Sequence, residues 1–154
     1  MKILIIYDTT STKRNTEKVA QAISEILKAN GFDVDCKYVN DVDPANVKNY
    51  DCVIAGSPTQ AFGATRPITQ FLGRFGRDEF SGKRAATFDT QLKAWWSGNA
   101  AKRIEKKLQN LGFKMTMPPL VTYVEGKMEE VHLKDGELEK TKKYAEDLAN
   151  KLQK

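Results

Sequence analysis

The chain has 154 residues and a mass of 17.3 kDa, which is the size of one globular domain. Hydrophobic residues make up 40% and charged residues 29%, so the composition excludes a collagen, a disordered chain and a disulfide scaffold. The net charge of +5 is spread over both halves, since residues 1–77 hold 10 basic and 8 acidic side chains and residues 78–154 hold 15 and 12. We therefore expect a single domain over residues 1–154.

No apolar run approaches the roughly 18 residues that a membrane span needs, so no span is expected. The apolar block Met1–Asp8 is too short for a signal peptide, and no small-residue cleavage site follows it. It is typical of a buried first strand. We expect a cytoplasmic protein in which Cys36 and Cys52 are reduced.

The first half of the chain alternates between strand and helix patterns. Strands are expected at Ile3–Tyr7, Val34–Val39 and Asp51–Gly56, where branched apolar residues run together. A helix is expected from about Asn15 to Ala29, because capping residues precede its apolar face and a glycine follows it. The polar stretch Asn40–Asn49 predicts a loop or one irregular turn in place of a second full helix.

The second half continues the alternation. A short helix opens at Pro67, and strands are expected at Arg84–Phe88 and Leu120–Val124. A third helix, capped by Ser97, ends at Gly112, and a last helix covers 138–152. Five short apolar strands alternating with helices predict an α/β fold: one doubly wound five-stranded parallel sheet with helices on both faces.

The densest basic cluster lies on one side of the third helix. It consists of Lys102, Arg103, Lys106 and Lys107. No nucleic-acid recognition motif accompanies it, so a solvated helix face is favoured and no nucleic-acid partner is expected.

Three polar segments follow the first, third and fourth strands: Asp8–Thr16, Ser57–Arg66 and Asp89–Gly98. In open parallel sheets, ligands bind beyond the carboxyl ends of the strands, so these segments are the candidate site. The first holds five hydroxyl residues and two cations just before a helix start, which can bind a phosphate or merely cap the helix. It contains no glycine, so it is neither a Walker loop nor a dinucleotide fingerprint.

The other two segments carry aromatic residues. Phe62 is expected either to support a flat ligand ring or to fold back on the protein, and we expect at least one of Trp95 and Trp96 to contact such a ring. No catalytic acid, base or nucleophile stands out, and His132 is expected at the surface, away from this site. A phospho-accepting receiver is excluded, because Gly56 and Ser57 stand where it needs an aspartate.

Taken in order, these motifs resemble the flavodoxin-like family of FMN-binding redox proteins over nearly the full chain. Asn15-Thr16-Glu17 matches the end of that family's Ser/Thr-x-Thr-Gly-x-Thr phosphate loop, which begins here at Thr9 or Ser11. Gly56-Ser57-Pro58-Thr59 matches its middle loop. Trp96-Ser97-Gly98 is similar to the flavin-flanking loop in flavodoxin modules of flavo-diiron proteins.

The resemblance implies a strand order of 2-1-3-4-5, FMN as the cofactor, redox proteins as partners and no metal. The phosphate would lie at the first helix, and the ring would lie between the loops of Phe62 and of Trp95 and Trp96. The implied FMN-binding residues are Thr9, Thr10, Ser11, Thr12, Lys13, Arg14, Asn15, Thr16, Ser57, Pro58, Thr59, Gln60, Phe62, Asp89, Thr90, Trp95, Trp96 and Gly98.

The phosphate loop departs from the family pattern. Arg14 or another residue replaces its glycine, and a non-glycine residue is disfavoured in a left-handed conformation, so a different path is expected. Lys13 and Arg14 either neutralise the phosphate or face solvent. In the implied strand order one strand separates Cys36 from Cys52, which places their backbones roughly 9–10 Å apart, too far for a disulfide. Both are expected to be buried free thiols.

Three functions remain open at this point. The first is an FMN protein that carries electrons between partner proteins. The second is an FMN-dependent reductase or oxidase acting on a quinone, a porphyrinogen or NAD(P)H. The third is a flavin-free scaffold, and the oligomeric state is also open.

Overall fold

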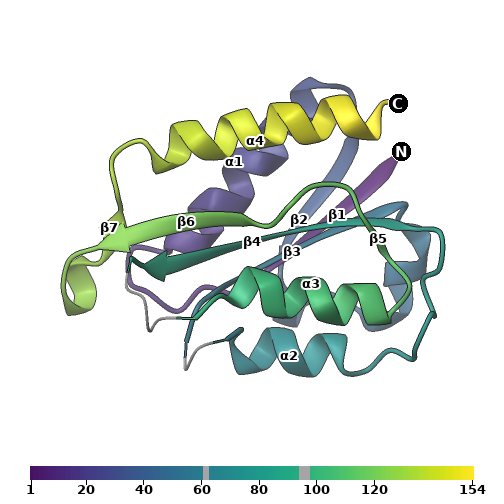
Figure 1. Cartoon of the computed structure of the whole chain (residues 1–154), viewed down its shortest axis with the longest axis horizontal. Helices are drawn as coiled ribbons and strands as arrows, with labels where there is room; N and C mark the ends of the chain where they lie inside the picture. Colours follow the sequence, from purple (N-terminus) through teal and green to yellow (C-terminus); the bar gives the residue numbers. More distant parts are fainter. Residues whose placement is uncertain (61–62, 94–97) are drawn as a thin grey trace.

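The computed structural model describes residues 1–60, 63–93 and 98–154 (Figure 1). Its strands form one sheet in the order β2-β1-β3-β4-β6-β7, and β5 pairs with β4. The strands are β1 (Lys2–Tyr7), β2 (Asp33–Tyr38), β3 (Cys52–Pro58), β4 (Arg84–Leu92), β5 (Lys114–Met115), β6 (Leu120–Glu125) and β7 (His132–Leu133). The helices are α1 (Asn15–Ala29), α2 (Arg66–Leu72), α3 (Ala100–Asn110) and α4 (Glu137–Leu152), with short 3₁₀ helices η1 (Val39–Asp41), η2 (Pro44–Asn49) and η3 (Met128–Glu130).

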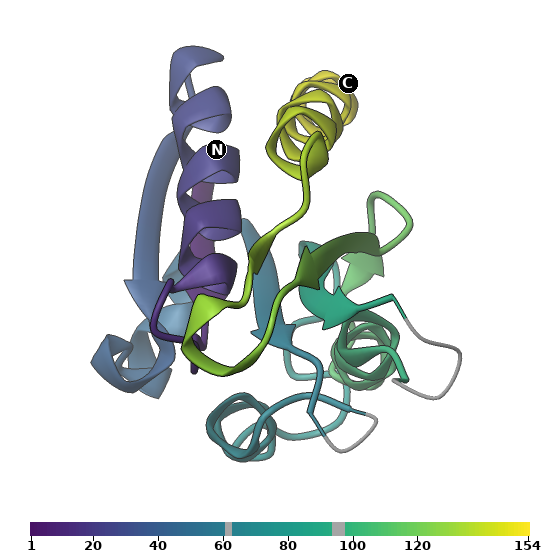
Figure 2. The same ribbon diagram turned by 90° about the vertical axis from the view of Figure 1, so that its left-hand side faces the viewer.

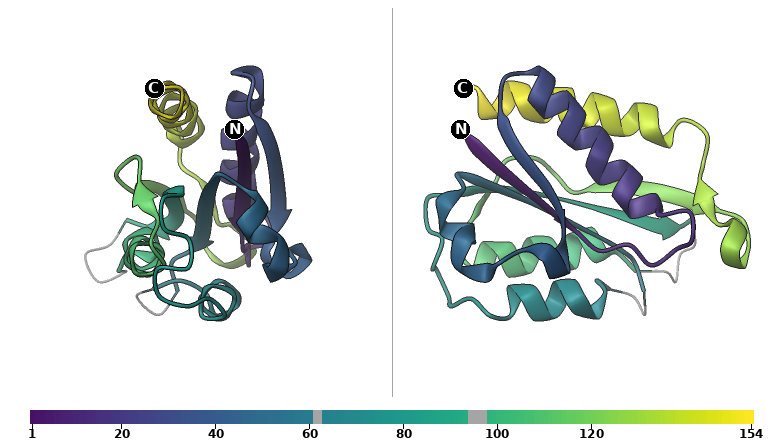
Figure 3. Two further views of the ribbon diagram at one scale, coloured as in Figure 1. Left: turned by 90° about the vertical axis from the view of Figure 1, so that its right-hand side faces the viewer. Right: turned by 180° about the vertical axis from the view of Figure 1, so that it is seen from behind.

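Helices cover both faces of the sheet. Helices α1 and α4 lie side by side on one face, and α2 and α3 lie together on the other (Figures 1 and 3). Because successive side chains of a strand point to opposite faces, Ile3 and Ile5 of β1 pack toward α1 and α4, whereas Leu4 and Ile6 pack toward α2 and α3. All four side chains are buried, as the continuous apolar run predicts.

The predicted strand order is confirmed, but the strand count of five is too low. Strands β2, β1, β3, β4 and β6 are parallel neighbours in the expected 2-1-3-4-5 arrangement. The fifth strand comes in two pieces, β5 and β6, on either side of Pro118 and Pro119. Proline has no amide hydrogen for a sheet ladder, so the pairing is interrupted there. The two-residue β7 then adds an antiparallel edge.

Two strands extend further than predicted. Strand β3 continues through Pro58 and β4 continues through Leu92, whereas the apolar runs predicted ends at Gly56 and Phe88. Ser57 and Asp89 therefore occupy paired strand positions, with Ser57 opposite Asp89. The predicted loops begin two to four residues later than the sequence indicates.

Three local predictions have different outcomes. The polar stretch after β2 forms η1 and η2 instead of a full helix, in agreement with the prediction. The cap of α3 is Asn99, whose side chain accepts the Lys102 amide at 2.9 Å, so the prediction of Ser97 is wrong. Cys36 and Cys52 are free thiols on either side of β1, but only Cys52 is fully buried, because Cys36 lies on the edge strand β2.

None of the helices in the described segments is long and apolar enough to cross a membrane.

Candidate functional site

The loops that follow β1, β3 and β4 meet at one edge of the sheet, which faces the viewer in Figure 2. Several hydrogen bonds join them. The hydroxyls of Thr16 and Thr90 lie 2.8 Å apart, and the Gln60 side-chain amide donates to the Thr10 hydroxyl at 2.9 Å. The Thr59 amide donates to the Thr90 carbonyl at 2.9 Å. The structure thus brings residues of all three sequence motifs together.

The first loop folds back onto the start of α1 without closing it. The Ser11 hydroxyl accepts the Asn15 amide at 3.3 Å, and the Arg14 amide donates to the Ser11 carbonyl at 3.0 Å. Within the described segments, the following backbone amides have no acceptor: Thr10, Ser11, Thr12, Lys13, Thr16 and Glu17. A helix start with free amides and the positive end of the helix dipole suits a phosphate.

Arg14 itself adopts the left-handed conformation, with φ 53° and ψ 48°. The expectation that a non-glycine residue forces another path is therefore wrong at this position. Left-handed geometry costs about 1–2 kcal/mol for such a residue. The Arg14 guanidinium contacts Glu17, with Nη2 and Oε1 2.8 Å apart, and the Tyr7 hydroxyl donates to the same carboxylate at 2.6 Å. These local bonds offset part of the backbone cost.

The two cations of the first loop have carboxylate neighbours. Arg14 is paired with Glu17, and this hydrogen bonding holds the pKa of the Glu17 carboxyl below its usual range. The Lys13 ammonium lies 4.0 Å from the Glu130 carboxylate, and both side chains are well exposed. The role of Lys13 and Arg14 in phosphate binding remains a prediction.

In the second loop, Ser57 and Thr65 fix the chain before α2. The buried Ser57 hydroxyl accepts the Thr65 amide at 2.9 Å and donates to the Pro58 carbonyl at 2.7 Å. Gln60 and Gly63 exchange two backbone hydrogen bonds, at 2.8 and 2.9 Å. The predicted ring contact Phe62 falls outside the described residues.

Asp89 is fully buried beneath the start of α3, a placement that the sequence motif did not predict. Its Oδ2 accepts the Ala101 amide at 3.2 Å, the Gln91 side chain at 3.0 Å and the Thr59 hydroxyl at 3.3 Å. Its Oδ1 has no partner among the described residues. Burial raises the pKa of Asp89 to about 6, because a charged carboxylate is poorly solvated there.

A cavity of about 150 Å³ lies where the loops meet. It is lined by Thr10, Ser11, Asn15, Thr16, Pro58, Thr59, Gln60, Thr90, Gln91, Leu92, Val124 and Val131. Ligand pockets usually measure about 300–1,000 Å³, so a bound ring needs the Gln60–Thr10 contact to open or extends over the surface. Trp95 and Trp96 lie outside the described residues, and Gly98 borders a separate hollow along α3.

The segment after β6 contributes to the site, although no sequence motif marks it. The Val131 carbonyl accepts the Asn15 side-chain amide at 3.0 Å, and Val131 and Val124 line the cavity. His132 is exposed as predicted, but β7 lies beside the first loop, so the expectation of a place away from the site is wrong. The hydrogen bond from Asn15 to Val131 and the ion pair of Lys13 with Glu130 show this proximity.

The donors and acceptors of the site fit a phosphorylated flavin. The free amides are donors for phosphate oxygens, and so is the buried Thr9 hydroxyl, which has no partner in the part of the chain that the structure describes. The unpartnered Oδ1 of Asp89 can accept from a ring N–H group. Outside the two gaps, no group of three or more His, Cys, Asp or Glu side chains could hold a metal ion.

Comparisons with known proteins point to one family. The family model for flavodoxin matches residues 5–143. An uncharacterized protein of Methanocaldococcus jannaschii is 30% identical over 115 residues, which cover 75% of this chain and 71% of that protein. The anaerobic nitric oxide reductase flavorubredoxin of Klebsiella pneumoniae is 30% identical over 121 residues, which cover 75% of this chain but only 24% of that protein.

Solved structures show the same fold. Oxidised flavodoxin 2 from Bacillus cereus superposes with a TM-score of 0.83 at 25% identity, covering 98% of this chain and 99% of that one. A flavodoxin from the domain Archaea gives a TM-score of 0.78 at 24% identity, with both chains fully covered. The chain therefore belongs to the flavodoxin family and is an FMN-binding redox protein.

Proposed function

We propose that this chain carries electrons between partner proteins. The observation that supports this function best is the position of the site at the open edge of the sheet. Leu92, which lines the cavity at the end of β4, is 53% exposed. A ring held there keeps one side near the surface, where a partner's redox centre can approach it. A cytoplasmic location belongs to the same proposal.

The proposed FMN contacts divide into two groups. Amides and hydroxyls of Thr9–Thr16 would hold the phosphate, because they surround the start of α1. Backbone groups of Ser57–Gln60 and Asp89–Thr90 would meet the polar edge of the ring, and Phe62 with Trp95 and Trp96 would flank it. FMN supplies the one- and two-electron chemistry, while the protein binds and orients it and sets the surrounding charge.

An FMN titration tests the first part of this proposal. We expect FMN fluorescence to be quenched with a dissociation constant at or below the micromolar range. Lys13→Ala should weaken binding several-fold if the ammonium contacts the phosphate, whereas Lys28→Ala, near the other end of α1, should not. A chain that fails to bind micromolar FMN would instead be the flavin-free scaffold.

Electron exchange tests the second part. The reduced, FMN-loaded chain should transfer electrons to a redox protein such as cytochrome c in single-turnover mixing. It should not sustain oxidation of NAD(P)H with a quinone as acceptor when no second protein is present. Sustained turnover under those conditions would favour an FMN-dependent reductase over an electron carrier.

A further inference from the structure

A furrow runs along the face formed by α2 and α3. It consists of two hollows of about 410 and 750 Å³, which share Arg103 and Lys107 as lining residues and which we call the α2–α3 furrow. Ile68, Leu72 and Ile104 form the floor of the smaller hollow, but their side chains are only 1–3% exposed. The furrow is therefore distinguished by its cationic side chains, and its apolar floor offers little surface to a partner.

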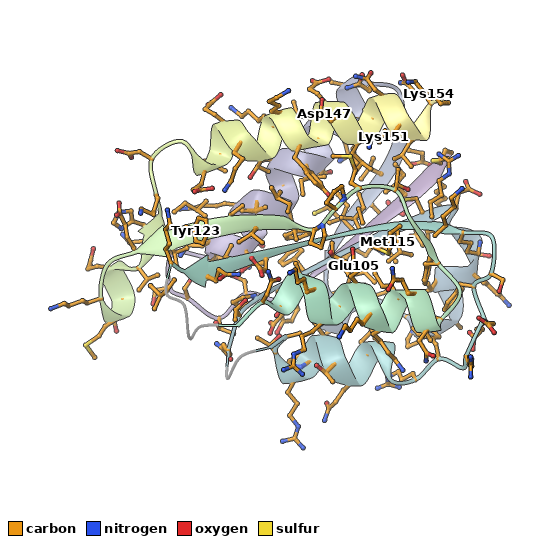
Figure 4. All side chains as sticks on the ribbon, viewed as in Figure 1. Glu105, Met115, Tyr123, Asp147, Lys151 and Lys154 are labelled. Carbon is orange, nitrogen blue, oxygen red and sulfur yellow. The ribbon has the colours of Figure 1, made fainter. Side chains whose placement is uncertain are left out.

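The charged side chains that line the furrow in the described residues are all positive. Lys102, Arg103, Lys106 and Lys107 line it, no carboxylate is among its described lining residues, and none of these four cations has an ion-pair partner within residues 1–60, 63–93 and 98–154. At about 100° per residue the four cations fall within one side of α3. Glu105 falls on the opposite flank, nearer the sheet (Figure 4).

The furrow begins at the candidate FMN site. Gly63 of the second loop lines the smaller hollow, and Gly98 of the third loop lines the larger one. The Arg103 side chain connects the two, since its Cδ lies 3.7 Å from the position that a Cβ on Gly63 would occupy. From these loops the furrow extends along α3 to Asn110. A protein seated in it would lie against both loops that flank the ring.

We propose that the α2–α3 furrow docks an acidic surface of a redox partner protein. This inference rests on the proposed electron-carrier function and names the chemistry of the partner. Carboxylates of the partner would pair with the four cations of the furrow. Complementary charge also steers the encounter, which raises the association rate at low ionic strength.

Two other occupants fit the furrow less well. A second copy of this chain would meet the furrow with a net charge of +5 of its own, so long-range repulsion opposes that contact. A nucleic acid would pair with the cations through its phosphates, but the sequence carries no nucleic-acid recognition motif, and a nucleic acid has no redox centre to bring to the ring. An acidic redox protein suits both the charge of the furrow and its place beside the loops of the site.

Two double variants with equal charge change test the proposal. Lys102→Glu with Lys106→Glu alters the furrow, and Lys28→Glu with Lys151→Glu is the matched control on α1 and α4, on the other face of the sheet. All four lysines are exposed, and circular dichroism checks that both variants fold. Each variant lowers the formal charge from +5 to +1, so any difference between them reports position alone.

The first readout is electron transfer from a reduced, acidic [2Fe–2S] ferredoxin to the FMN-loaded chain in a stopped-flow instrument. We expect the second-order rate constant to fall about tenfold or more for the furrow variant and less than about twofold for the control. The difference should disappear near 1 M salt, where the Debye length is about 3 Å. Equal losses in both variants would overturn the proposal.

The second readout does not depend on FMN. Binding of fluorescent poly-L-glutamate to the FMN-free chain should weaken in the furrow variant and persist in the control. If FMN fails to bind while this difference holds, the electron-carrier function fails and the anionic docking surface stands. Tighter binding of a 20-base-pair DNA duplex than of poly-L-glutamate, or self-association that only the furrow variant abolishes, would overturn the proposal.

Discussion

The hydroxyls of Thr16 and Thr90 lie 2.8 Å apart, although 74 positions separate the two residues in the sequence. Thr16 is at the start of α1 and Thr90 is near the end of β4, and their side chains are 1% and 4% exposed. Each hydroxyl satisfies the other in a place that water does not reach. The pair therefore fixes the start of α1 against β4.

We expect Thr90→Val to lower the free energy of unfolding by about 1–3 kcal/mol, because it keeps the side-chain shape but leaves the buried Thr16 hydroxyl unpaired. Thr16→Val should do the same. The double variant Thr16→Val with Thr90→Val should cost less than the sum of the two, since no unpaired hydroxyl remains. Urea unfolding of the FMN-free chain measures all four proteins, and strict additivity would show that the hydroxyls are not coupled.

Arg14 offers a test of its left-handed conformation. Arg14→Ala and Arg14→Gly both remove the guanidinium and its contact with Glu17, so their difference isolates the backbone. We expect Arg14→Gly to be more stable than Arg14→Ala by about 1 kcal/mol, because glycine adopts φ > 0 without steric cost. Thermal unfolding with a matched buffer is the measurement.

An ordinary helix position provides the control for that comparison. At Gln21, an exposed residue within α1, the order should reverse, and glycine should be less stable than alanine by about 1 kcal/mol. If alanine is also preferred at position 14, Arg14 does not hold the left-handed conformation in solution.

Local signals predicted much of the fold. The bounds of α1 agree with the prediction from Asn15 to Ala29, although the N-cap is Arg14, which makes no side-chain capping hydrogen bond, and not Asn15 or Thr16. The ends of the strands were harder to predict. Polar residues from Asp89 to Gln91 indicated a loop, but tertiary contacts satisfy them in place and the ladder continues. Local composition cannot indicate hydrogen-bond partners that come close only when the chain folds.

The candidate site, like the fold, could be predicted only in part. The sequence indicated which loops gather at the sheet edge, because strand order alone decides that. It could not indicate that Val131 accepts a hydrogen bond from Asn15, since 116 positions separate them and no motif marks Val131. Nor could it choose Asn99 over Ser97 as the cap of α3, because both residue types cap well and only backbone geometry selects one.

Gly56 has a packing role that can be tested. A Cβ added there would lie 2.1 Å from Cε2 of the fully buried Phe88, which pairs with Gly56 across β3 and β4. Gly56→Ala should therefore lower the free energy of unfolding by about 1–3 kcal/mol through overpacking. Adding Phe88→Leu, which shortens the clashing ring, should recover part of that loss.

Gly76 serves as the control for Gly56. The nearest atom to a Cβ at Gly76 lies 3.7 Å away, at the end of the Glu79 side chain, so Gly76→Ala should change stability by no more than about 0.5 kcal/mol. Equal effects at the two positions in urea unfolding would mean that the Phe88 contact is not the cause.

Because of Asp89, the free energy of unfolding should fall as pH rises, which is the opposite of the usual effect of a carboxyl group. Its pKa is raised from 3.8 to about 6 by burial, so the folded state binds this proton more tightly than the unfolded state does. The stabilisation from the protonated form is complete below about pH 4 and is lost as pH rises through 6. A shift of about two pH units corresponds to about 3 kcal/mol.

The variant Asp89→Asn isolates this contribution, because its amide does not titrate. The free energy of unfolding of the FMN-free protein, minus that of Asp89→Asn, should fall by about 3 kcal/mol between pH 4 and pH 7. Glu17→Gln provides a comparison of opposite sign, since the pKa of Glu17 is lowered and its stabilisation is lost as pH falls. A wild-type minus Asp89→Asn difference that stays constant with pH would mean that the carboxyl is solvated. That result would contradict the burial of Asp89 beneath the start of α3. It would also contradict the presence of a desolvated Oδ1 that could accept from a ring N–H group.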